Sequence, residues 1–171
     1  MLAALVAAAL LACSVASPET QVKEALARLG PVELAAGGPA HVSLERVRFA
    51  DVVVSLDGPR ALVLAVVEAD GRAGGGDGPA LAYVGREAFV MERCQGPRWC
   101  LDRGGLPALG GVLAALREVP REPGARVVAW QVRVERDAAT AGEDYEVAGR
   151  RLRVRRELRR DGGAWAVSAA R

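Results

Sequence analysis

Aromatic residues and histidine are scarce in this 171-residue chain, at 4% and one residue respectively. Valine, leucine and alanine must therefore fill the core, and 51% hydrophobic residues are enough to build one domain. A strong net charge is also lacking, because 23 basic and 21 acidic side chains leave only +2. That balance gives no reason to expect a polyanionic partner such as nucleic acid.

Motifs that carry enzyme chemistry are absent as well. No serine lies in Gly-x-Ser-x-Gly, and no Walker loop, HExxH or paired Cys/His zinc pattern occurs. The glycine-rich run at 74–78 lacks the Lys-Ser/Thr of a phosphate loop. We therefore expect no enzyme, no catalytic residue, no cofactor and no metal. The alternative is a small enzyme with a cone-shaped pocket, in which the only histidine, His41, pairs with an acid such as Asp51.

The first twelve residues, MLAALVAAALLA, form an uncharged apolar run that is too short for a permanent membrane span of about 20 residues. Such a run is typical of a secretory signal peptide. It ends in Leu10-Leu11-Ala12-Cys13, which resembles the bacterial lipobox. The resemblance implies that residues 1–12 are removed, that Cys13 is acylated, and that residues 13–17 tether the domain to a membrane. Plain secretion, with cleavage near Ser14 or Ser17, is one alternative, and a cytosolic protein is another.

Cysteine use agrees with export. With Cys13 assigned to lipid, Cys94 and Cys100 remain, and they flank a Gly-Pro turn signal. We expect a disulfide between them across a hairpin, which is natural outside the cytoplasm. Two free buried thiols are the alternative. The expected location is the bacterial cell envelope, facing the periplasm or the outer membrane.

Helical patterns occupy two segments. Ser17-Pro18-Glu19 predicts a helix start with a capping serine, and Gly30-Pro31 ends that helix. Apolar residues at helical spacing from Leu109 to Leu116 predict a second helix, which Pro120 ends.

Strand patterns fill most of the remaining chain. The predicted strands are 41–49, with a bulge near Arg46, then 51–56, 61–67, 81–84, 86–94, 128–134, 145–147, 150–160 and 165–167. Residues 61–67 are continuously apolar, which predicts a strand buried on both faces. Gly85 is expected to separate two strands, and 69–79 is expected to be a glycine-rich loop.

The predicted fold class is α+β, with a curved antiparallel sheet and two amphipathic helices in a single domain over residues 18–171. Residues 83–100 and 145–167 share the order Tyr, turn Gly, long strand, tight turn and Trp. This order suggests a duplicated helix-plus-meander unit with halves 18–103 and 104–171. Two merely similar hairpins are the alternative.

The segment Arg159-Arg160-Asp161-Gly162-Gly163-Ala164-Trp165-Ala166-Val167 resembles the closing strand, turn and tryptophan of the nuclear transport factor 2-like superfamily, or of the broader cystatin-like fold. The likeness covers roughly the last 30 of the 171 residues. It implies a helix packed on a curved antiparallel sheet. Enzymes of that superfamily often use an Asp/His pair inside a cone-shaped cavity, but the fold alone does not assign a function.

Seven arginines between residues 150 and 160 are the most concentrated feature of the sequence. On a strand, Arg151, Arg153 and Arg155 share one face at a spacing of about 6.5–7 Å. Guanidinium groups so spaced suit phosphates or carboxylates of lipid headgroups, cell-wall polymers or an acidic protein. A solvated face neutralised by acids such as Glu143 and Asp144 is the alternative. The sequence thus predicts a lipid-anchored envelope protein that binds a ligand or serves as a structural component.

Overall fold

The computed structural model describes residues 16–36, 40–74, 76–96 and 98–170, so Cys13 and the lipobox lie outside the described residues. Two helices, α1 (Pro18–Ala27) and α2 (Pro107–Arg117), accompany one sheet. Its strands are β1 (Val32–Ala36), β2 (Ala40–Asp57), β3 (Arg60–Ala73), β4 (Ala80–Gln95), β5 (Arg98–Leu101), β6 (Arg126–Glu135), β7 (Ala138–Val147), β8 (Arg150–Asp161) and β9 (Ala164–Ala170). Most of the described chain is therefore strand, within the broad α+β class that the sequence predicts.

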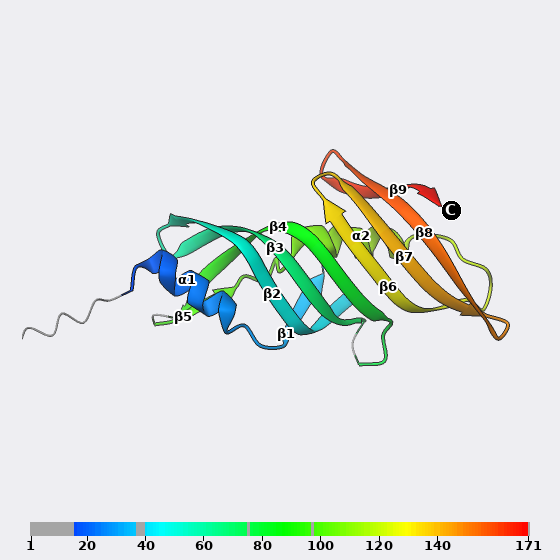
Figure 1. Cartoon of the computed structure of the whole chain (residues 1–171), viewed down its shortest axis with the longest axis horizontal. Coiled ribbons are helices and arrows are strands. Elements are labelled where there is room, and N and C mark those ends of the chain that lie inside the picture. Colours follow the sequence, from blue (N-terminus) through cyan, green and yellow to red (C-terminus); the bar gives the residue numbers. More distant parts are fainter. Residues whose placement is uncertain (1–15, 37–39, 75, 97, 171) are drawn as a thin grey trace, which may run out of the picture.

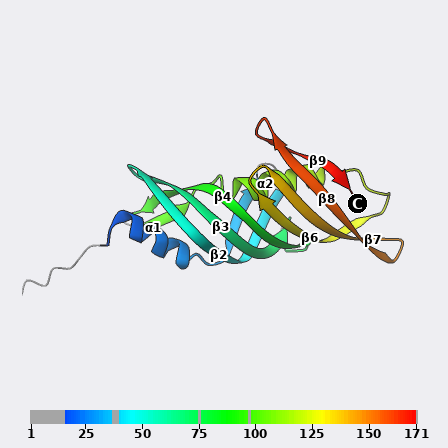
Figure 2. The ribbon, with the colours of Figure 1, turned by 45° about the horizontal axis from the view of Figure 1, so that its top comes forward.

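The strands follow the order β1-β2-β3-β4-β6-β7-β8-β9, with β5 paired to the end of β4 (Figure 1). Every pair is antiparallel except β4 with β6, which is parallel. A helix followed by a four-stranded meander thus occurs twice, and the parallel pair joins the two meanders in one open sheet. In Figures 1 and 2, α1 and β5 lie at one end of the molecule and β8 and β9 at the other.

α1 begins where the sequence predicts, and α2 contains the predicted helical residues 109–116. The Ser17 hydroxyl accepts a hydrogen bond from the Thr20 N–H at 3.2 Å, and a proline occupies the first turn of each helix. α1 buries Val22 and Leu26. α2 buries four residues at helical spacing, Leu109, Val112, Leu113 and Leu116.

The helices cover one face of the sheet, here called the inner face. α2 packs against β1 and β9, the two edge strands, as well as against β4 and β6 in the middle. The sheet therefore curls around α2, as Figure 2 shows in a turned view. Trp165 of β9 lies against the α2 backbone at Gly111, where an added Cβ would come within 2.5 Å of the indole. Only glycine allows this close approach.

On the opposite, outer face of the sheet, the prediction that residues 61–67 are buried on both faces is wrong. Along β3, alternate residues from Ala61 to Ala69 are buried on the inner face, but Leu62 and Leu64 on the outer face are 54% and 40% exposed. The continuously apolar run 61–67 is therefore not buried on both faces within one chain, because both helices lie on the same side.

Gly85 does not divide two strands, because β4 runs through it. A Cβ at Gly85 would lie 2.3 Å from the Tyr83 hydroxyl, so the glycine makes room for the tyrosine side chain to reach Glu87. The resemblance between 83–100 and 145–167 does not hold either: the first segment is β4 with β5, whereas the second spans the end of β7, all of β8 and part of β9.

The other differences concern strand limits. The two strands expected over 41–56 form the single strand β2, which has irregular pairing at 44–46, as predicted, and again at 50–53. Strand β1 and the first half of β7 were not predicted, and β3 extends into the expected loop as far as Ala73.

Two buried carboxylates of the sheet hold the two ends of α2. At its start, Glu87 of β4 accepts hydrogen bonds from the backbone N–H groups of Ala108 (2.9 Å) and Leu109 (2.8 Å). This contact replaces a side-chain N-cap, which α2 lacks, and places a carboxylate at the positive end of the helix dipole. The Tyr83 hydroxyl donates a third bond to Glu87 at 2.6 Å.

Beyond the end of α2, Glu143 of β7 is fully buried and forms a two-bond pair with Arg121 at 2.8 and 3.1 Å. Arg121 also donates to the carbonyl oxygens of Leu116 and Val119, which closes the last turn of α2. Arg156 of β8 donates to the same carboxylate at 3.3 Å. The cluster thus ties the helix to β7 and β8.

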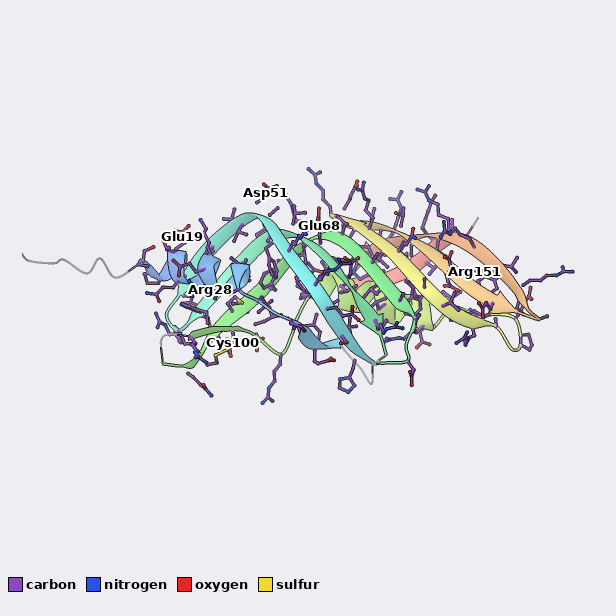
Figure 3. The ribbon with its side chains drawn as sticks, turned by 60° about the horizontal axis from the view of Figure 1, so that its bottom comes forward. Glu19, Arg28, Asp51, Glu68, Cys100 and Arg151 are labelled. Carbon is purple, nitrogen blue, oxygen red and sulfur yellow. A yellow bond between two sulfur atoms is a disulfide. The ribbon has the colours of Figure 1, made fainter. Side chains whose placement is uncertain are left out.

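The predicted disulfide between Cys94 and Cys100 is confirmed, with 5.8 Å between the Cα atoms. It links the end of β4 to β5 beside α1, where Figure 3 labels Cys100 and Arg28. Among the described residues, neither helix has the length and apolar character that a membrane crossing requires.

Candidate anion-binding site

The arginine row, defined as Arg151, Arg153 and Arg155, lies on the outer face of β8. Pairing with β7 places these residues opposite Glu146, Asp144 and Gly142 respectively. Because side chains alternate along a strand, all three guanidinium groups project from the same side. Figure 3 shows Arg151 at the end of the molecule away from α1.

Asp144 holds two members of the row. Its carboxylate forms a two-bond pair with Arg153, with 2.9 Å between Nη2 and Oδ2, and accepts a bond from Arg151 at 3.3 Å. Hydrogen bonds from Arg153 and the charges of both arginines lower the pKa of Asp144. The carboxylate therefore stays ionised and orients both side chains, which remain 64% and 62% exposed.

Arg155 has different surroundings, because glycine stands opposite it on β7. Within the part of the chain that the structure describes, no acidic side chain lies within ion-pair distance of Arg155. Next to it is a hollow of about 480 Å³, here called the Gly142 hollow, whose floor is that glycine. Arg133, Arg153, Arg155, Gln131 and Thr140 provide its polar lining.

The Gly142 hollow is suited to an anion. Its lining offers three guanidinium groups, an amide and a hydroxyl, all of which can donate hydrogen bonds. Arg133 has only a loose partner, Glu135 at 3.6 Å, and its side chain is 65% exposed. A phosphate or carboxylate could therefore contact Arg133 and Arg155 without displacing Arg153 from its pair with Asp144.

The other residues considered from the sequence do not form a site. His41 and Asp51 are both exposed and lie ten residues apart on the same strand, about 30 Å at the usual rise, so the structure does not bring them together. Asp51 marks an irregularity of β2 and has a positive φ of 52°. Within residues 16–36, 40–74, 76–96 and 98–170, no cluster of three potential metal ligands occurs.

Sequence reasoning missed three residues that shape the hollow, namely Gln131, Arg133 and Gly142. Alternating polar positions along 128–135 did place Gln131 and Arg133 on one face. The position of Gly142 was also informative, since an isolated glycine in a strand often marks a site where a ligand or another backbone segment approaches closely. The sequence alone did not show that β6 and β8 lie on either side of β7, which brings their side chains together.

A comparison of the chain with family models, with curated proteins and with solved structures found no match in any of the three.

Proposed function

We propose that this chain is a lipid-anchored protein of the bacterial cell envelope that binds an anionic ligand in the Gly142 hollow. The observation that carries the proposal is the convergence of Arg133, Arg153 and Arg155 on a hollow in a sheet face that no helix covers. Phosphate and carboxylate groups are the ligands that such a set of guanidinium groups recognises.

Other features support export rather than the identity of the ligand. The disulfide suits an oxidising compartment, and the lipobox precedes α1 by only four residues, which would hold the domain close to a membrane. We also infer that the two helix-plus-meander units derive from a duplication, since both have the same order of elements.

Removing the Arg155 guanidinium should weaken anion binding more than removing that of Arg151. Arg155→Gln loses a cation with no ion-pair partner, whereas Arg151 is already engaged with Asp144. A lost hydrogen bond to a charged group costs about 1.5–3 kcal/mol, so the dissociation constant should rise at least tenfold. The measurement is titration of the full chain carrying Cys13→Ser with inorganic phosphate, and separately with vesicles that contain an anionic lipid.

Two further variants show whether the hollow itself binds the anion. Gly142→Val fills the floor and leaves the charge unchanged, and valine is favoured in strands; it should abolish binding. Arg28→Gln removes one exposed charge at the far end of the molecule and should leave binding unchanged. Equal affinities for the Cys13→Ser parent, Arg155→Gln, Gly142→Val and Arg28→Gln would contradict the proposal. Binding to vesicles that is weakened in Arg155→Gln, with no binding to phosphate, would assign the anion to a lipid headgroup.

The anchor has its own test. Cys13→Ser should either release the protein from the membrane fraction or block the removal of residues 1–12. In both cases the mass of the acyl chains is lost, and with it an attachment to which burial of each CH₂ contributes about 0.8 kcal/mol. Mass spectrometry and fractionation of cells measure both changes. Identical mass and partition for the two proteins would show that Cys13 carries no lipid.

A further inference from the structure

The outer face of the sheet carries a second feature, away from the Gly142 hollow. Large aliphatic side chains are exposed in the middle of β3 and on the strand beside it, with Val53 at 61%, Leu62 at 54% and Leu64 at 40%. Pairing places Leu64 opposite Val53 of β2, and Leu62 opposite Val90 of β4. These four residues therefore form one continuous cluster, here called the β3 patch.

Antiparallel sheets with one covered face usually alternate apolar residues inside with polar residues outside. The segment Ala61–Val67 breaks that alternation and has the composition of a strand covered on both sides. Both helices lie on the inner face, so a single chain leaves the β3 patch uncovered. Contiguous exposed apolar clusters of this kind mark interaction surfaces.

The charges around the β3 patch indicate the occupant. At one end of β3, Arg60 pairs with Glu92 at 2.8 Å, and at the other, Arg46 pairs with Asp70 at 3.1 Å. Each end therefore carries both signs, and an identical surface turned about a two-fold axis finds opposite charges to meet. Because each end is net neutral, the rim offers no net positive charge to attract an anionic membrane.

We propose that the β3 patch is the interface of a homodimer, in which two copies pack their outer faces against each other. Facing sheets lie about 10 Å apart with interdigitating side chains, which suits a row of valines and leucines. The dimer would have four layers, helix, sheet, sheet and helix, and each β3 would then be buried on both faces, as its sequence predicts. The proposal does not depend on anion binding at the Gly142 hollow.

Sedimentation equilibrium of the full chain with Cys13→Ser tests the proposal. The Cys13→Ser chain without a further change should sediment as a dimer. Adding Leu64→Lys should raise the dissociation constant about a hundredfold or more, because each dimer loses two buried leucines and gains two buried charges. Leu152→Lys is the matched control, since Leu152 is also 40% exposed but lies on β8. Circular dichroism should show all three proteins folded.

A second measurement does not depend on a disruptive change. Ser55 lies opposite Leu62 and is exposed, so Ser55→Cys should be crosslinked to its copy by a thiol reagent that spans about 10 Å. Ser168→Cys, exposed on β9, should not be. A monomeric wild type, or loss of the dimer in Leu152→Lys as much as in Leu64→Lys, overturns the proposal. So does a monomer that binds anionic vesicles through Leu64.

Discussion

Replacing Glu143 by alanine should lower the free energy of unfolding by about 3–5 kcal/mol, the usual cost of leaving a buried charge without its partner. Arg121 and Arg156 have only 18% and 10% of their side chains exposed, and Glu143 is the acid with which both form ion pairs. The loss is large against the total stability of a domain, about 5–15 kcal/mol. Urea unfolding followed by tryptophan fluorescence measures it.

A surface pair gives the matched control. Glu92 pairs with Arg60, whose side chain is 66% exposed, so Glu92→Ala should cost less than about 1 kcal/mol. Replacing Glu143, Arg121 and Arg156 together by apolar residues should recover most of the loss, because no buried charge then remains unpaired. If Glu143→Ala and Glu92→Ala cost the same, the cluster does not hold the end of α2.

The contribution of Glu143 to the free energy of unfolding should also depend on pH. Burial by itself would raise the pKa of Glu143, but hydrogen bonds and charges from Arg121 and Arg156 lower it below its usual range. The stabilisation is therefore present above the unfolded-state pKa of about 4.3 and is lost as the pH falls through the folded-state value. Glu143→Gln should lack this part of the acid sensitivity.

Local patterns in the sequence were enough to predict both helices, the disulfide and most of the strands. The Ser17 hydroxyl caps the first turn of α1, where Pro18 is also favoured, and a short turn joins Cys94 and Cys100. Such features depend on residues that are close in the chain. Strand β1 was missed because its five residues are too few to show an alternation, and it forms only by pairing with β2.

The errors at Gly85 and at 61–67 have a different origin, since both depend on elements distant in sequence. The first depends on the contact of Glu87 with α2, and the second on the placement of both helices on one face of the sheet. Gly85 is required because Tyr83 reaches Glu87, which in turn binds α2 some twenty residues later. The arginine row was predicted as a face of β8, but its separation into paired and unpaired members follows from which residues of β7 stand opposite. Asp144 and Gly142 could be assigned to those places only once the register was known.

Replacing Glu87 by alanine should lower the free energy of unfolding by at least about 3 kcal/mol. The change leaves the buried Tyr83 hydroxyl, the buried Leu109 N–H and the half-buried Ala108 N–H without a partner. Each buried unsatisfied group costs about 1–3 kcal/mol. Chemical unfolding measures the loss. Glu68→Ala is the control, because Glu68 lies exposed on the outer face of β3 and should cost under about 0.5 kcal/mol.

Glu87 should also respond to pH in the sense opposite to Glu143. Burial raises the pKa of Glu87, although the hydrogen bonds from Tyr83 and from the start of α2 oppose the rise. Glu87 therefore loses its proton at a lower pH in the unfolded chain than in the folded chain. Its contribution to the free energy of unfolding is fully present below a pH of about 4.3 and declines as the pH rises through the folded-state pKa. The stability of the wild type relative to Glu87→Gln should fall over that interval. A difference that rises with pH would show that the three hydrogen bonds outweigh burial and that Glu87 is held ionised.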